Sequence, residues 1–139
     1  MSSFTTNNAE KDELAYIKKL KVGEAMRLCR DTTYIDVIIE LTKHPDPKVR
    51  QRAVKEMCPC HVQKDLDAFW TRVLEMRHDE AANVRQQVLH DLCDGSPAHL
   101  EFDVAEALQD FNTDPDSEIR RKAHKALTSY RRTGKWNVL

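Results

Sequence analysis

The sequence contains no long apolar run and little glycine or proline. No stretch approaches the ~18 consecutive apolar residues of a transmembrane helix, so a membrane-spanning segment is excluded. Three glycines and five prolines among 139 residues are typical of a protein built from long helices rather than sheets. An excess of one charge is also lacking, with 22 Lys and Arg against 23 Asp and Glu. Net charge alone therefore predicts neither a nucleic-acid nor a membrane partner.

An export signal is lacking as well. Residues 1–8 have neither the basic stretch nor the apolar stretch of a signal peptide. Without an export signal, the four cysteines are expected to be free thiols in a reducing compartment. These features predict one intracellular, cytoplasmic domain whose Ser/Thr/Asn-rich residues 1–9 are disordered.

What the sequence does contain is one segment that occurs three times. Asp46–Met57 recurs 35 residues later as Ala81–Leu92 and again as Asp116–Leu127. Each copy has an arginine preceded by Val or Ile and followed by apolar residues three and seven positions later; these arginines are Arg50, Arg85 and Arg120. A period of this length is typical of stacked helical repeats, in which each unit buries its apolar faces against the next.

The same period extends into the stretch before each segment. Apolar residues at the i, i+4, i+7 spacing of one helical face are Tyr34, Ile38 and Leu41, then Phe69, Val73 and Met76, then Val104, Leu108 and Phe111. The matching sets in the second helices are Val49, Ala53 and Met57, then Val84, Val88 and Leu92, then Ile119, Ala123 and Leu127. We expect both sets to be buried in three helical hairpins.

This pattern resembles the HEAT and HEAT-like repeat family, in which a turn with Asp and often Pro precedes Val-Arg, a small residue and a long aliphatic residue. The resemblance covers residues 32–132. It implies an all-α fold, an α-solenoid of three HEAT-like hairpins with a period of 35 residues. Residues 10–31 would then form N-terminal capping helices, and residues 133–139 a C-terminal tail.

Turn and capping signals place the helices within these units. Asp31 or Thr32 can cap the helix that ends near Lys43, and Pro47 suits the first position of the next helix. Gly23 is expected to interrupt the capping helices. The predicted helices cover residues 10–21, 25–30, 32–43, 47–58, 62–77, 82–94, 100–111 and 116–132.

The outward positions of the second helices are the candidate binding residues. Lys and Arg dominate these positions, whereas the first helices carry mainly Asp and Glu. In HEAT-like proteins the second helices line the concave side, so the resemblance implies a basic, amide-rich surface that attracts acidic partners. The alternative interpretation is a face that is charged only because it is solvated. The candidates are Lys48, Gln51, Arg52, Lys55, Gln86, Gln87, His90, Arg121, Lys122 and Lys125.

The three repeated arginines have a structural interpretation. In HEAT-like proteins this arginine usually pairs with an acidic residue from the loop of a neighbouring repeat, which forms a ladder. The resemblance assigns five residues to such a ladder: Asp46, Arg50, Arg85, Asp116 and Arg120. Ala81 replaces the aspartate in the second repeat, so Asp79 or Glu80 would have to serve there.

No catalytic, cofactor or metal site is expected. The cluster Cys-Pro-Cys-His at residues 58–61 has His90 and Cys93 nearby in the repeat register. Zinc requires four convergent ligands, and buried cysteines that pack as small apolar residues are the preferred interpretation. Trp70 is expected to be buried in its hairpin. Trp136 either folds back over the last repeat or forms an exposed contact for another protein.

The sequence therefore predicts a non-enzymatic, monomeric HEAT-repeat scaffold or adaptor that binds an acidic protein or peptide on its second helices. Two alternatives remain. Nucleic-acid binding through the phosphate backbone would use the same cations. A role as a HEAT-like accessory subunit of a bilin lyase rests on the resemblance alone.

Overall fold

A computed structural model describes residues 14–57 and 67–139, and within these ranges the chain is all-helical, with no strand. The α-helices are α2 (Val22–Asp31), α3 (Ile35–Leu41), α4 (Pro47–Glu56), α5 (Asp67–Glu75), α6 (Ala82–Gly95), α7 (Glu101–Phe111) and α8 (Ser117–Thr133). Three short 3-10 helices are η1 (Ala15–Lys19), η2 (Met76–His78) and η3 (Ala98–Leu100). The predicted all-α class is confirmed for these residues.

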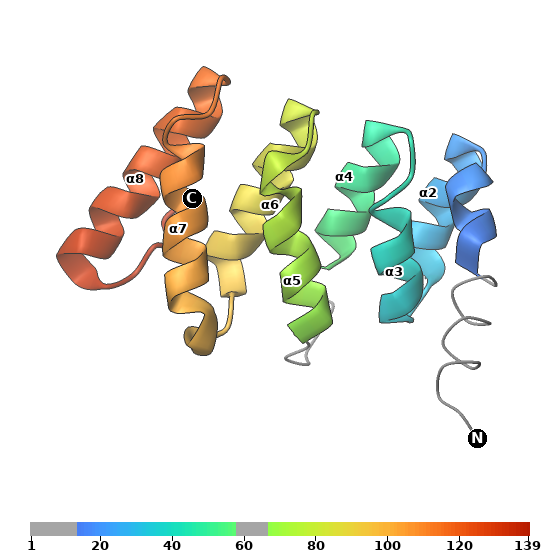
Figure 1. Ribbon diagram of the computed structural model, residues 1–139, viewed down its shortest axis with the longest axis horizontal. Helices are drawn as coiled ribbons and strands as arrows, with labels where there is room; N and C mark the ends of the chain where they lie inside the picture. Colours follow the sequence, from blue (N-terminus) through green and yellow to red (C-terminus); the bar gives the residue numbers. More distant parts are fainter. Residues whose placement is uncertain (1–13, 58–66) are drawn as a thin grey trace.

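The helices form two layers that run along the long axis of the molecule (Figure 1). In one layer, α2, α4, α6 and α8 pack against one another in chain order. In the other layer, η1, α3, α5 and α7 do the same. Each of the pairs α3–α4, α5–α6 and α7–α8 also packs across the two layers. The helix α8 lies at one end of the row (Figure 1).

The apolar positions that recur every 35 residues form the core between the layers. All nine such residues in α4, α6 and α8 or directly after α4, and eight of the nine that precede them, are at most 4% exposed. Trp70 is 4% exposed and stacks on Phe69 at a ring-centroid distance of 4.8 Å, which confirms its predicted burial. Tyr34 is the exception, at 73% exposed. It lies outside α3 as the extended residue before the helix, so the helical spacing does not apply to it.

Capping residues explain three of the helix ends, the starts of α4 and α8 and the end of α8. Asp46 caps α4, Pro47 occupies its first turn, and Asp116 caps α8. Gly134 ends α8 with φ of 75°, a left-handed conformation that glycine adopts without a Cβ clash. The predicted helix end at Gly134 is confirmed.

Several predicted boundaries are wrong. Gly23 lies inside the first turn of α2, and the break in the capping region falls at Leu20 and Lys21, whose backbones are extended. Neither Asp31 nor Thr32 is the residue that precedes α3; the Thr32 hydroxyl instead accepts from the Tyr34 N–H at 3.2 Å. The predicted disorder of residues 1–9, the start of the first helix and the helical residues 62–66 fall outside the described residues.

Helices long and apolar enough to cross a membrane are absent from the described part of the chain.

Candidate binding surface

Two arginines join successive helix pairs through bidentate contacts with aspartates. Arg50 donates from Nε and Nη2 to the two carboxylate oxygens of Asp79, each at 3.0 Å. Arg85 makes the same two contacts with Asp114, at 2.8 and 3.1 Å. Arg50 and Asp114 are 7% and 6% exposed, so water screens these pairs little. The predicted pairing of arginines with acids of a neighbouring unit is present, and it belongs to the framework.

The remaining terminal nitrogen of each arginine binds the loop before its own helix. In Arg50, Arg85 and Arg120, Nη1 donates to the carbonyl oxygens five and six residues earlier, at 2.7–3.1 Å. This shared geometry explains why an arginine recurs every 35 residues. Arg120 differs in one respect: its guanidinium has no carboxylate partner among residues 14–57 and 67–139.

Two of the five residues predicted for the ladder do not take part in it. Asp46 and Asp116 cap helices instead: their side chains accept from the N–H groups of Lys48 at 2.8 Å and Ile119 at 3.0 Å. The aspartates that pair with arginines lie two register positions earlier, at 79 and 114. A capping carboxylate is turned toward the free N–H groups of its own helix, whereas the earlier loop position faces the preceding helix pair. Of the two substitutes considered for Ala81, Asp79 is the hydrogen-bonded partner of Arg50, and Glu80 makes a longer ion pair with it, with Oε1 3.8 Å from Nη2.

His44 occupies the register position of Asp79 and Asp114 in the first unit. The Asp46 N–H donates to His44 Nδ1 at 3.0 Å, as the Ala81 and Asp116 N–H groups donate to the two aspartates. Because Nδ1 accepts, Nε2 carries the proton and donates to the Leu20 carbonyl at 2.7 Å. His44 is 4% exposed, and its hydrogen bond to Leu20 links the end of η1 to the first helix pair.

Two of the amides predicted to bind a partner, Gln51 and Gln86, join helices of the layer formed by α2, α4, α6 and α8. Asn83 Nδ2 on α6 donates to Gln51 Oε1 on α4 at 3.0 Å. Gln86 Nε2 donates to Glu118 Oε2 on α8 at 3.4 Å. Gln51 and Gln86 are half-buried. We therefore assign these side chains to the framework rather than to ligand contact.

The six predicted cations of this layer divide into two groups, on α4 and on α8. Arg52 and Lys122 each pair with a glutamate four residues away on the same helix, at 2.9 and 3.2 Å. Because α6 lies between α4 and α8, the two groups are separated by two helix spacings of about 8–10 Å each. Four of these six cations are exposed and have no acidic partner in the described ranges: Lys48, Lys55, Arg121 and Lys125.

The helix α8 is strongly basic. It carries six Lys or Arg and one acidic residue, whereas α7 carries four acidic residues and no Lys or Arg. Arg131 and Arg132 are exposed and, like Arg121 and Lys125, have no acidic partner in the part of the chain that the structure describes. Cations therefore accumulate at the end of the row rather than along the whole layer.

Two clefts open on this helix. The larger has a volume of about 590 Å³ and the smaller about 170 Å³. Arg121 and Lys125 line both clefts. The other cationic or titratable side chains around them are His124 and Arg132 in the larger cleft and His90 and Lys122 in the smaller. We call Arg121, His124, Lys125 and Arg132 the α8 basic surface.

Residues 134–139, which we call the return segment, pack back onto this end of the molecule. Trp136 stacks on Tyr130 of α8 at a ring-centroid distance of 4.7 Å, so the folded-back alternative for Trp136 is the one the structure shows. Val138 lines the larger cleft and Leu139 the smaller one. Sequence reasoning missed His124, Arg132, Val138 and Leu139. The spacing from Arg121 and Lys125 to Thr128 and Arg132 along one helical face was the available signal for Arg132.

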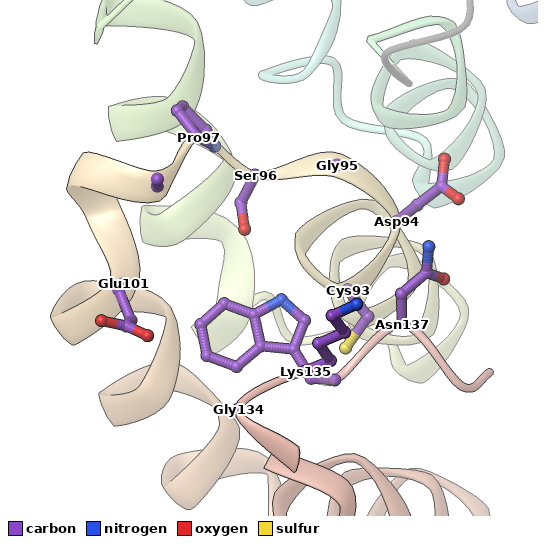
Figure 2. A pocket seen from close by; sticks show the side chains of 11 residues that line it. Cys93, Asp94, Gly95, Ser96, Pro97, Glu101, Gly134, Lys135 and Asn137 are labelled. Atoms are coloured by element: carbon purple, nitrogen blue, oxygen red, sulfur yellow. The ribbon is translucent and has the colours of Figure 1, made fainter.

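A third cleft, of about 340 Å³, lies on the other side of the return segment. Figure 2 shows Ser96 and Pro97 of the α6–α7 connection and Glu101 of α7 facing Gly134 and Lys135 across it. Cys93, also at this cleft, is 3% exposed. Burial raises the pKa of the Cys93 thiol to about 12, so it is not a nucleophile at neutral pH.

Asp91 of α6 is the buried titratable group without a role in the ladder. Its side chain is 0% exposed, and Oδ1 accepts from Gln87 Nε2 at 3.0 Å. Its Oδ2 has no hydrogen-bond partner within residues 14–57 and 67–139. Burial raises the pKa of Asp91 to about 8, opposed by the Gln87 hydrogen bond. The predicted binding residue Gln87 thus supports a buried carboxyl group.

The described residues contain no group of three or more His, Cys, Asp and Glu side chains placed to hold a metal ion. The Cys-Pro-Cys-His cluster at residues 58–61 falls outside them, so its interpretation stays a prediction.

No protein-family model, characterised protein or solved structure matches this chain significantly.

Proposed function

We propose that this chain is an α-solenoid of three HEAT-like hairpins that acts as a non-enzymatic adaptor and binds an acidic protein or peptide through the α8 basic surface. The observation that carries the proposal is the set of exposed cations on α8 without acidic partners in the described ranges. A cluster of one sign beside low-dielectric protein attracts the opposite charge and raises its local concentration.

The hairpin arrangement supports the first half of the proposal. Each pair of helices packs against the next in both layers, and the arginine–aspartate contacts recur at the period of the sequence. Such a stack offers an extended surface for a macromolecule. We expect the protein to be monomeric.

Burial and pairing of the other cations support the choice of surface. Arg50 and Arg85 are neutralised within the framework, and Arg52 and Lys122 have glutamate partners on their own helices. Arg121 and Lys125 have no such partner in the described part of the chain, and both line clefts that also hold apolar side chains. A ligand with carboxylates and some apolar surface fits this combination better than a bare polyanion.

Fluorescence anisotropy with a labelled peptide of twelve glutamates tests the proposal. We expect binding at low salt that weakens as salt rises, because the Debye length falls to about 8 Å at physiological ionic strength. The double variant Arg121→Glu/Lys125→Glu should bind about tenfold or more weakly. A matched reversal at exposed cations near η1, Lys19→Glu/Lys21→Glu, changes the net charge equally and should have a much smaller effect.

A charge reversal at Arg52 and Lys122 would be a less specific test, because it would also break an ion pair within each of the two helices. Equal losses in the two double variants would show that net charge alone governs binding, and the α8 basic surface would be refuted. A labelled 20-base-pair DNA duplex serves as the competing ligand. Tighter binding to the duplex than to the peptide, lost in the α8 variant, would replace the acidic-protein proposal with nucleic-acid binding.

A further inference from the structure

The return segment is firmly attached at its beginning. The N–H of Gly134 donates to the Tyr130 carbonyl at 2.8 Å, and the Ser129 hydroxyl donates to the Lys135 carbonyl at 2.7 Å. The Lys135 N–H donates to the Thr133 hydroxyl at 3.2 Å. With the stacking of Trp136 on Tyr130, these contacts hold residues 134–136 to the end of α8.

The tip of the segment is held much more weakly. Val138 and Leu139 are 37% and 38% exposed. The Val138 N–H donates to the Trp136 carbonyl at 2.8 Å, a contact within the segment itself. No hydrogen bond or ion pair joins the two tip residues to the helices among the described contacts. The described contacts that place the tip on α8 are therefore apolar.

This weakly held tip lines the same clefts as the cations that the proposed function requires. Val138 shares the larger cleft with Arg121, Lys125 and Arg132. Leu139 shares the smaller cleft with Arg121 and Lys125, together with the apolar Leu89. A peptide that reaches Arg121 and Lys125 from both clefts must occupy the space of the tip.

We propose that the return segment is an internal competitor for the α8 basic surface, and that the partner is an extended acidic peptide with aliphatic side chains that displace Val138 and Leu139. This inference rests on the proposed function. The aliphatic side chains of the peptide take the apolar positions of the tip, while its carboxylates pair with Arg121, Lys125 and Arg132. The anchored residues 134–136 remain in place, so displacement does not unfold the end of α8.

In competition of this kind, the apparent affinity equals the intrinsic affinity multiplied by the fraction of free molecules whose tip is displaced. Weakening the apolar contacts of the tip raises that fraction, and adding carboxylates to the tip lowers it. The two changes act in opposite directions on the same measurement.

The test compares the variants Val138→Ser/Leu139→Ser and Val138→Glu/Leu139→Glu with the unchanged chain. The probes are a labelled peptide with a Val-Leu pair between two runs of five glutamates and the labelled peptide of twelve glutamates. We expect the Ser variant to bind the Val-Leu peptide about threefold to tenfold more tightly, with a smaller gain for the glutamate peptide. The Glu variant should bind both peptides more weakly than the unchanged chain.

Matched controls carry the same changes at Phe102 and Gln109, two exposed residues of α7. Phe102→Ser/Gln109→Ser should leave affinity unchanged, and Phe102→Glu/Gln109→Glu reports the effect of two added charges away from α8. The Glu change at the tip should exceed this control effect. NMR provides a second readout, because the Val138 and Leu139 methyl signals should move toward random-coil positions when the Val-Leu peptide is added.

The outcomes separate the two proposals. If the unchanged chain binds the peptides but the Ser variant binds them equally or more weakly, the tip is not a competitor and the internal-competition proposal is overturned. An effect of the Glu variant no larger than that of its α7 control has the same consequence. If neither the unchanged chain nor the Ser variant binds either peptide at low salt, both the adaptor function and the competition are refuted.

Discussion

The buried Asp91 makes the stability of this protein depend on pH in an unusual direction. Its carboxyl group is 0% exposed, Oδ2 has no hydrogen-bond partner among the residues that the structure describes, and burial raises its pKa from 3.8 to about 8. The folded protein therefore holds a proton on Asp91 at neutral pH that the unfolded chain releases. The informative substitution is Asp91→Asn, which keeps the shape and the acceptor for Gln87 but removes the titration.

The direction and size of the pH effect on the free energy of unfolding follow from proton linkage. Between pH 3.8 and pH 8 the folded state binds more protons at Asp91 than the unfolded state, so the free energy of unfolding falls as pH rises. The slope is about 1.4 kcal/mol per pH unit in this window and vanishes above pH 8. From pH 5 to pH 8 the Asp91 contribution falls by about 3–4 kcal/mol. Against a total stability of about 5–15 kcal/mol, this loss is large.

Urea unfolding followed by circular dichroism at pH 5 and pH 8 measures the effect. At pH 5 the unfolded chain already releases the Asp91 proton, so the Asn variant should be more stable by about 1–2 kcal/mol. At pH 8 this advantage should grow to about 5 kcal/mol. The difference between the two proteins cancels the titration of the six histidines and the other carboxylates. Asp103→Asn, on the exposed surface of α7, provides the same chemical change without burial.

The repeat itself supplies a second perturbation. At the register positions of Gln87 and Asp91, α4 has Arg52 and Glu56, which form an ion pair at 2.9 Å. Gln87→Arg should give Asp91 a similar partner, lower its pKa and flatten the pH dependence. If the stability of the unchanged chain and of Asp91→Asn varied in parallel between pH 5 and pH 8, Asp91 would be ionised in the folded state, and the argument from burial would be wrong.

Two further predictions concern the framework and the thiols. Asp79→Ala leaves the buried Arg50 guanidinium without its hydrogen-bonded carboxylate and should lower the free energy of unfolding by about 3 kcal/mol. Glu80→Ala, at a side chain that is 89% exposed, should change the free energy of unfolding by less than about 0.5 kcal/mol. Equal effects of the two substitutions in urea unfolding would contradict the pairing of Arg50 with Asp79. Burial raises the pKa of the Cys29 thiol to about 11 and that of the Cys93 thiol to about 12. In a Cys58→Ser/Cys60→Ser background, both thiols should therefore react with a thiol reagent at pH 8 only as fast as the protein opens. Rapid labelling of the native protein would contradict this prediction.

The period of the sequence predicted the core because burial is the property that every unit shares. Positions such as Val49, Val84 and Ile119 must all face the other layer, so the same residue class recurs at them and the helix phase can be read directly. Tyr34 shows where this reasoning stops. Its apolar ring fits the spacing, but the helix begins one residue later, and a helix boundary depends on capping contacts that apolar spacing does not report.

The partners in the ladder were harder to predict than its arginines. An aspartate just before a helix can cap that helix or pair with a neighbouring unit, and the sequence does not distinguish the two roles. The aspartates at 46 and 116 cap, and those at 79 and 114 pair. The first unit has His44 at the position of the pairing aspartates, so the sequence does not show an aspartate recurring at that position in all three units.

The position of the return segment could not be predicted, because no repeat position corresponds to it. Its contacts with α8 are tertiary contacts that depend on the left-handed turn at Gly134 and on the stacking of Trp136 against Tyr130. The glycine predicted the helix end. Nothing in the periodic pattern could indicate which face the chain would then cover.

The end of the row explains why the cations of α8 are available to a ligand. Arg121 occupies the register position of Gln51 and Gln86. Gln51 of α4 hydrogen-bonds to α6, and Gln86 of α6 hydrogen-bonds to α8. Arg120 likewise occupies the position of the arginines that bind the aspartate of the next unit, but it has only carbonyl partners among the described residues. The two groups that elsewhere hold the following unit are thus consecutive residues of α8. A partner that places carboxylates there would make the contacts that Asp79 and Asp114 make within the stack, and the recognition of an acidic ligand would extend the chemistry that joins the units themselves.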